Sequence, residues 1–334
     1  MSVADVTVDV PEGRDLAGHI AALLTKNYSG LSARIRSLDN EIRCPDSAIT
    51  LRLYYPALRS GTPTIGELVD TIALYIIPFA LPRSQIADVY KLYDIVTVEE
   101  FSRKHSELEQ RALALFKRVQ DTTRRNGEAG ELLLYILTEW ILEAPQLLAK
   151  MCLKTNRNMP VHGSDGIHVR YFEDRNALCL YYGESKLHAD VGKAISEATA
   201  SITTALKHES TKHEMELVHQ HIDLTGLDQN AKKSILQYLD PLDEHSNHRI
   251  NVATCLVGFN FDAFKNGLAP GTDHETQFRQ LAAAKLTELA PRISAALKAT
   301  TDQIEFFFFP VPSVEAMRDL FQSKIGWKKP SEKS

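Results

Sequence analysis

The chain has 334 residues and a composition within the range of globular proteins, with a formal net charge of −5 at pH 7. Its length exceeds that of one average domain and predicts a large domain together with a smaller one. The negative charge excludes a surface that binds nucleic acid over its whole area, because affinity for phosphates comes from Lys and Arg, so any such binding must be local. The longest apolar run, residues 72–81, is interrupted by Pro78 and is too short to span a bilayer, so no membrane segment is expected.

Residues 1–97 have the pattern of a mixed, mainly helical region. Met1–Val10 contains two acidic residues and no basic segment, which argues against a secretory signal peptide and favours a cytoplasmic protein. Helical periodicity is found in residues 15–25 and 65–77, with a strand-like run at 49–55 between them. The region contains no motif to which a chemical role can be attached, so its role is unassigned.

Residues 98–327 are predicted to form a second unit, followed by a flexible tail at 328–334. The unit begins with an amphipathic helix at 98–119 and continues with an apolar helix for which Asn126 is a plausible N-cap and Pro145 the end. The elements expected after it are strands at 146–154, 166–172 and 177–186, helices at 189–207, 212–222 and 229–239, a strand at 250–259, a helix at 272–297, a strand at 304–309 and a short helix after Pro312. This order predicts an α/β fold, a mixed sheet flanked by helices.

Several conspicuous residues are better explained by structure than by chemistry. The cysteines are scattered without a CxxC pair, so neither a zinc site nor disulfides are predicted. The histidine pairs 219/221 and 245/248 lie in polar sequence and are interpreted as solvated. The run Phe306–Phe309, which is followed by Pro310, is expected to be a strand buried on both faces.

A predicted β-hairpin brings charged residues together. Two strand-like runs flank the polar tetrapeptide Glu173–Asn176, whose composition suits a tight turn. If Glu173 faces Asn176, the same register makes Asp165 and Glu184 direct cross-strand neighbours, with Cβ atoms ~5 Å apart. Lys186 lies two residues beyond Glu184 and points to the same face, because side chains alternate along a strand.

Two carboxylates and an ammonium on one strand face suggest a metal site. Hard oxygen ligands with open water positions suit Mg²⁺ or Mn²⁺, and Lys186 could then orient or deprotonate a water that attacks a phosphodiester. The alternative is an exposed salt bridge between Glu184 and Lys186, with Asp165 as a strand-start cap, and an ExK triplet alone is a weak signal. His168 falls on the opposite strand face, which favours packing over catalysis.

The order of these elements resembles the PD-(D/E)xK nuclease core of restriction enzymes and resolvases: a helix with a glutamate, a strand, a strand that starts with Asp, a strand that ends in ExK, and a helix. More closely, residues 126–186, with NGEAGELLLY, LLAKMCLKTNRNMPVHGSDGIHV and LYYGESK, are similar to HamA, the nuclease subunit of the Hachiman anti-phage defence system. The downstream elements match only in their order, and residues 1–97 are not covered. The resemblance implies a restriction-endonuclease-like fold.

Roles for individual residues follow from the resemblance where the motif matches. Asp165 and Glu184 would be metal ligands, and Lys186 would be the catalytic lysine. Ser164 stands where the motif has proline, which is its least demanding element.

The resemblance also implies that a glutamate from the preceding helix completes the metal site. Glu131 is preferred as this catalytic residue and metal ligand, because it lies deeper in the apolar helix, where a carboxylate without a role is costly. Glu128 lies one helical turn away and stays a candidate. An acidic residue that is simply favoured near a helix N-terminus is the alternative for either position.

A local basic segment offers a contact for DNA. Residues 145–163 contain Lys150, Lys154, Arg157 and His162 and no Asp or Glu. Lys154 and Arg157 are predicted to contact phosphates, with His162 as a further candidate, and a solvated loop is the alternative.

These features predict a Mg²⁺-dependent deoxyribonuclease that hydrolyses phosphodiester bonds within an anti-phage defence complex. The chain contains no GxxxxGK[ST] phosphate loop and hence no evident ATP motor. The resemblance implies that a separate, HamB-like helicase subunit supplies this function in a hetero-complex and restrains the nuclease. The alternatives are a non-catalytic subunit that binds DNA or a partner, and another enzyme of the same fold, such as a restriction enzyme or junction resolvase.

Overall fold

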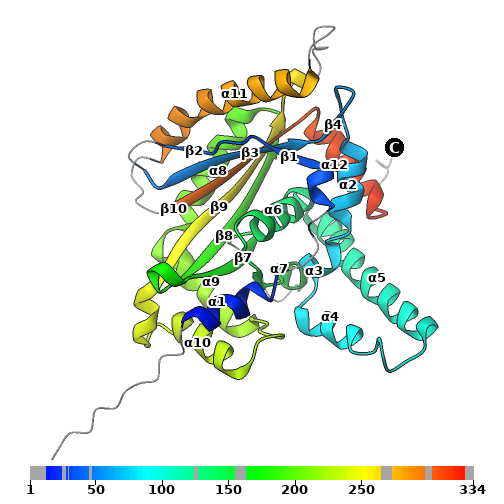
Figure 1. Ribbon diagram of the computed structural model, residues 1–334, viewed down its shortest axis with the longest axis vertical. Coiled ribbons are helices and arrows are strands. Elements are labelled where there is room, and N and C mark those ends of the chain that lie inside the picture. The colour runs from blue at the N-terminus through cyan, green and yellow to red at the C-terminus, as the bar shows by residue number, and fades with distance from the viewer. Residues whose placement is uncertain are drawn as a thin grey trace, which may run out of the picture.

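The structure is a computed structural model, and it describes residues 13–24, 28, 30–44, 47–123, 127–154, 163–264, 273–297 and 303–327. Helices cover both faces of a mixed, eight-stranded sheet (Figure 1). The predicted α/β fold with a mainly helical N-terminal region is therefore confirmed. The segments Met1–Val10 and 328–334 lie outside the described residues.

The central strands of the sheet run parallel and its edges are antiparallel. The strands are β1 (Ile35–Ser37), β2 (Ile42–Arg43), β3 (Ile49–Pro56), β6 (Gln146–Leu148), β7 (Gly166–Phe172), β8 (Ala177–His188), β9 (Arg249–Asn260) and β10 (Gln303–Val311). They follow the order β1-β3-β10-β9-β8-β7-β6, and β2 pairs with β3. Strands β3, β10, β9 and β8 run parallel to one another, whereas β7 pairs antiparallel with β8. A separate short hairpin joins β4 (Leu58–Arg59) to β5 (Thr62–Pro63).

Most helices lie where the periodicity predicted them. They are α1 (Gly13–Ala21), α2 (Ile65–Ala73), α3 (Ile76–Ala80), α4 (Arg83–Tyr90), α5 (Val98–Thr123), α6 (Glu128–Ile141), α7 (Lys150–Lys154), α8 (Val191–Ala205), α9 (His208–His221), α10 (Gln229–Leu239), α11 (His274–Ala296) and α12 (Val314–Lys324). Helix α6 begins at Glu128 with Gly127 at its N-cap, and Asn126 lies outside the described residues. Within the described part of the chain, no helix is both long and apolar enough to cross a membrane.

The N-terminal region contributes a strand to the parallel part of the sheet. Strand β3 lies between β1 and β10, and its register aligns Ile49 with Ile304. Its side chains alternate between the two faces of the sheet, so that Leu51 and Leu53 pack on one face and Tyr54 on the other. The N-terminal region therefore shares its sheet and its apolar core with the rest of the chain.

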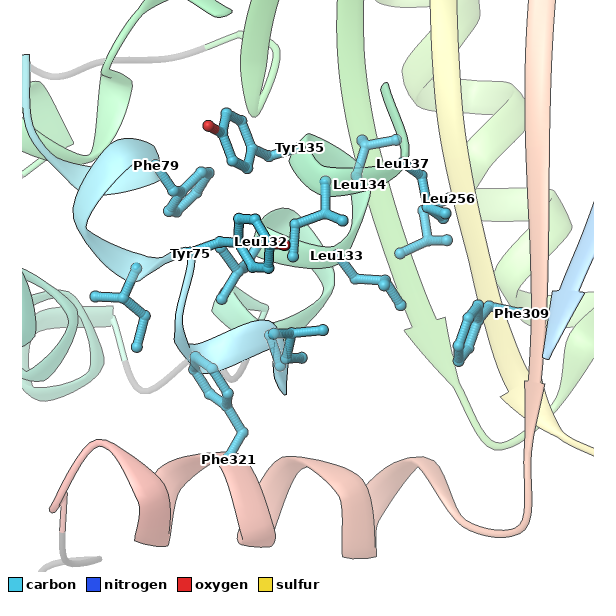
Figure 2. Close-up of a cluster of buried hydrophobic side chains, with 14 of the residues drawn as sticks. Tyr75, Phe79, Leu132, Leu133, Leu134, Tyr135, Leu137, Leu256, Phe309 and Phe321 are labelled. Atoms are coloured by element: carbon cyan, nitrogen blue, oxygen red, sulfur yellow. The ribbon is translucent and has the colours of Figure 1, made fainter. Parts of the chain in front are cut away.

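Two apolar layers sandwich the central strands. Phe306 and Phe308 pack on the face covered by α8 and α11, whereas Phe307 and Phe309 pack on the face covered by α6. All four are fully buried, which confirms the predicted doubly buried strand. Figure 2 shows the second layer, in which leucines of α6 lie between Phe309 of β10 and the aromatic side chains of α3 and α12.

Two expected elements differ from the structure. Residues 146–154, predicted as one strand, form the short strand β6 and then helix α7, because the segment LLAKMCLK is rich in helix formers and periodicity does not separate short apolar strands from helices. Residues 65–77, predicted as one helix, form α2 and α3 with a break at Leu74–Tyr75. Pro78 explains the break, because its ring clashes with the carbonyl of the residue four positions earlier and it has no N–H to donate.

Candidate active site on strand β8

The β7–β8 hairpin has the predicted register. Gly166 faces Gly183 at one end and Phe172 faces Ala177 at the other. The turn between them closes with the Asn176 N–H donating to the Glu173 carbonyl at 3.2 Å. Asn176 has a φ of 46°, a left-handed conformation that asparagine tolerates better than most residues. The polar tetrapeptide therefore fixes which side chains meet along the hairpin.

Asp165 lies beside Glu184 at the point where β7 begins. The Asp165 N–H donates to the Gly183 carbonyl at 2.6 Å, and the Asp165 Oδ2 atom accepts a hydrogen bond from the Ser185 N–H at 2.9 Å. These contacts are made to the residues on either side of Glu184. From Glu184 onward, β8 continues beyond the residues paired with β7 while it stays paired with β9. The Asp165 carboxylate thus accepts a hydrogen bond from a β8 backbone N–H that would have bonded to the backbone of β7 if β7 were longer.

Glu184 and Lys186 form an ion pair on the same face of β8. The Lys186 Nζ atom lies 2.5 Å from Glu184 Oε1, and the side chains are only 22% and 18% exposed. This limited exposure argues against an ordinary surface salt bridge. The three residues that the motif predicts to meet, Asp165, Glu184 and Lys186, are therefore brought together.

The net effect of burial and neighbouring charges is to raise the pKa of both residues. Burial raises the pKa of Glu184, and the nearby charge of Asp165 raises it further, against the opposing effect of Lys186. Burial alone would lower the pKa of Lys186, but its hydrogen bond to Glu184 and the charges of Glu184 and Asp165 raise that pKa above its ordinary value. Lys186 is therefore an ammonium at neutral pH, and the two carboxylates leave an excess of negative charge that favours a cation.

A pocket opens on the Glu184 face of β8. It has a volume of about 380 Å³ and is lined by residues of β8, α8, α9 and the turn before Asp165, among them Ser164, Glu184, Ser201 and Glu214. A hydrogen bond from Ser201 of α8 favours the charged form of the Glu184 carboxylate. Solvent and a small hydrated ion can therefore reach Glu184 from this side.

Helix α6 packs on the other face of β8. At Gly130 of α6, an added Cβ would overlap Ser185 Oγ and lie 3.0 Å from the Leu187 side chain. Ser185 and Leu187 alternate with Glu184 and Lys186, so the helix covers the face opposite the candidate site.

Among the described residues, the α6 glutamates do not form a group of three possible metal ligands with the hairpin acids. The Glu131 carboxylate lies against Gly127 at the helix N-cap, and the charge of Glu128 raises the pKa of Arg318 against the larger, lowering effect of burial. Glu128 is buried and Glu131 is half-buried, so the expectation that Glu131 lies deeper is wrong: depth along the helix does not decide which side of it is covered. Among the described residues, no group of three His, Cys, Asp or Glu side chains could hold a metal. A ligand role for Glu131 or Glu128 stays a prediction.

A comparison with protein families extends the resemblance over nearly the whole chain. The HamA family model matches residues 34–325. The chain belongs to the HamA family. The matched range includes β3, the β7–β8 hairpin and α12, and the family associates the chain with the Hachiman defence system. A comparison with curated proteins finds no match.

The basic segment of this HamA-family chain is only partly described. Arg157 and His162 lie outside the described residues, as does the side chain of Lys154, the last residue of α7, so their predicted phosphate contacts stay predictions. Lys150 is buried and bound to Glu214. Lys150 is therefore not available to phosphates, although it belongs to the basic segment at residues 145–163.

Sequence reasoning missed several polar residues near the site. Alternation along β8 places His188 on the face of Lys186, and its Nε2 atom lies 2.8 Å from the Glu197 carboxylate of α8. That position could have been found from the spacing alone. Ser201 and Glu214 could not, because they approach Glu184 from helices whose packing no local pattern specifies.

Proposed function

We propose that the chain is a metal-dependent deoxyribonuclease that hydrolyses phosphodiester bonds as the effector of a Hachiman defence complex. The observation that carries the proposal is the position of the Asp165 carboxylate, held by the backbone N–H of Ser185 beside the Glu184–Lys186 pair. Membership of the HamA family supports it, because the resemblance of the catalytic segment is to a nuclease subunit.

The donor set fits a hard divalent cation. Asp165 and Glu184 offer carboxylate oxygens beside a pocket. Burial and the repulsion from Asp165 raise the pKa of Glu184, and a bound cation would relieve this repulsion. Mg²⁺ or Mn²⁺ bound there would neutralise the charge that develops on a phosphodiester. Water can complete the coordination of Mg²⁺, and Glu131 or Glu128 stays the proposed further ligand.

The charged state of Lys186 favours one of its two candidate roles. An ammonium paired with Glu184 is a hydrogen-bond donor and cannot accept a proton. In this arrangement Lys186 therefore orients a water or a phosphate oxygen and stabilises negative charge. It could act as a base only after it had lost its proton.

DNA and a helicase subunit are the proposed partners of the chain in the cytoplasm. Lys154 and Arg157 would contact phosphates near the turn that leads to Asp165. A HamB-like helicase would restrain the nuclease until it is needed, because an unregulated nuclease would cut the DNA of its own cell. The chain itself contains no GxxxxGK[ST] phosphate-loop motif, and the proposed helicase would supply the ATP-driven function in a hetero-complex.

Cleavage by the purified chain tests the proposal. Labelled duplex and single-stranded DNA, incubated with Mg²⁺ or Mn²⁺, should be cut, and EDTA should stop the reaction. Binding of DNA without cleavage under any of these conditions would identify a non-catalytic binding subunit instead. Cutting at one sequence only, or only at branched junctions, would identify another enzyme of the same fold.

A further inference from the structure

A buried ion pair lies directly behind the turn that carries Asp165. Lys150, at the start of α7, and Glu214, in α9, have side chains that are 1% and 4% exposed. The Lys150 Nζ atom lies 2.8 and 2.6 Å from the two carboxylate oxygens of Glu214. No step of the proposed reaction uses either residue.

Both partners of this pair bind the residue that precedes Asp165. Lys150 Nζ donates to the Ser164 carbonyl at 2.7 Å and lies 3.1 Å from Ser164 Oγ. Glu214 Oε1 accepts hydrogen bonds from the Ser164 N–H at 2.6 Å and from Ser164 Oγ at 3.0 Å. Every polar group of Ser164 is thus held by this pair, and the peptide bond into Asp165 is fixed through its carbonyl oxygen.

Gly163 shows how closely the turn fits the pair. Its φ of 122° lies in the region that favours glycine, and an added Cβ would overlap Glu214 Oε1. The turn therefore rests directly on the Glu214 carboxylate. The same carboxylate lines the pocket that contains Glu184, so the support lies beside the candidate metal ligands.

A contribution to stability does not by itself account for such a pair. Removing two charges from water carries a large desolvation penalty, and apolar residues of similar size often replace a buried pair without loss of stability. The pair does provide directional bonds, and here they are directed at one backbone residue. Groups that orient metal ligands typically change metal affinity by about 10–100-fold when they are altered.

We propose that Lys150 and Glu214 are positioning residues that hold the Gly163–Asp165 turn so that the Asp165 carboxylate meets Glu184 in the geometry a metal requires. This inference rests on the proposed nuclease function for the identity of the ligands. The anchoring of the turn itself depends only on the contacts of Ser164. The two statements can therefore fail separately.

The test removes both charges of the pair at once. In Lys150→Met/Glu214→Leu both charges are replaced by apolar side chains, so no buried charge is left unpaired, and the polar groups of Ser164 lose their partners. Mn²⁺ affinity, measured by calorimetry on the full chain without DNA, should fall by about 10–100-fold. Amide hydrogen exchange at Ser164 and Asp165 in the metal-free protein should become faster, because the turn has lost its anchor.

Two further variants make the result specific. Arg52→Met/Glu305→Leu removes another largely buried ion pair, on the face of the sheet covered by α6, and should leave Mn²⁺ affinity and exchange at the turn unchanged. Gly163→Ala keeps both charges but forces the turn away from Glu214, and should weaken Mn²⁺ binding in the same way. It also keeps the inference testable if the double variant fails to fold.

The outcomes separate the inference from the proposed function. Wild-type Mn²⁺ affinity in folded Lys150→Met/Glu214→Leu, or in Gly163→Ala, would overturn the positioning role and leave the pair a structural one. If the wild-type chain binds no Mn²⁺, the proposed function fails. Exchange at Ser164 and Asp165 then still decides whether the pair holds the turn: faster exchange in the double variant supports the anchor, and unchanged exchange overturns it.

Discussion

Burial has opposite effects on two ionisable side chains of the same hairpin. It raises the pKa of Glu184, whose face of β8 opens into a pocket, and it lowers the pKa of His168 to about 4 on the face covered by α6. The His168 ring packs against Tyr135, and its Nδ1 atom lies 2.8 Å from the Ala144 carbonyl. His168 is therefore a neutral packing residue, as its place on the strand predicted, while Glu184 is an acid that a cation would stabilise.

The lowered pKa of His168 predicts a loss of stability in acid. An unfolded histidine has a pKa of about 6.5, so between that pH and about 4 the unfolded chain binds a proton that the folded chain does not. The contribution to stability is present above pH ~6.5 and is lost as the pH falls, by about 2 kcal/mol between pH 7 and pH 5. Urea unfolding at both pH values should show this loss in the wild type and in His248→Gln, an exposed control, but not in His168→Leu. An equal loss in His168→Leu would show that other groups cause the pH dependence.

At the scale of elements, local patterns predicted the hairpin and most helices but not how they pack. Strand β7 and helix α10 have the predicted bounds, because turn chemistry and a long amphipathic period specify them locally. Helix α7 was predicted as a strand, because a short apolar run has no distinctive period. The sequence did not predict which face of β8 is covered by α6. That face is set by the close contact at Gly130, which is made with residues far along the chain.

The close approach of α6 to β8 predicts a difference between two helical glycines. Gly130→Ala should destabilise the protein by about 1–3 kcal/mol, because the new Cβ overlaps Ser185 Oγ and crowds Leu187. Gly66→Ala in α2, where no atom lies within 4 Å of the added Cβ, should leave stability unchanged or raise it slightly. Denaturant midpoints measure both. A Gly130→Ala protein as stable as Gly66→Ala would mean that the helix is not held against the strand as described.

At the scale of the whole molecule, the candidate site combines local and long-range contributions. The meeting of Asp165, Glu184 and Lys186 could be predicted, because one hairpin register determines it. The support from Glu214 could not, because α9 reaches the turn only through tertiary packing. For the same reason, the sequence did not predict the pairing of β3 with β10 or the orientation of the α6 glutamates. Local sequence therefore predicts which residues meet at the candidate site. It does not predict the tertiary contacts that surround them.

The most direct test of the proposed site is the rate of DNA cleavage by single-residue variants. Asp165→Ala, Glu184→Ala and Lys186→Ala should each lower the Mg²⁺-dependent rate by at least about 10²-fold, the typical effect of removing one group that stabilises transition-state charge. Their thermal stability should stay close to that of the wild type, because none of the three side chains lies in the apolar core. Lys285→Ala, which removes a lysine paired with Glu288 on α11, is the matched control and should cut at the wild-type rate. Wild-type cleavage by any one of the three variants would contradict the assignment of this site.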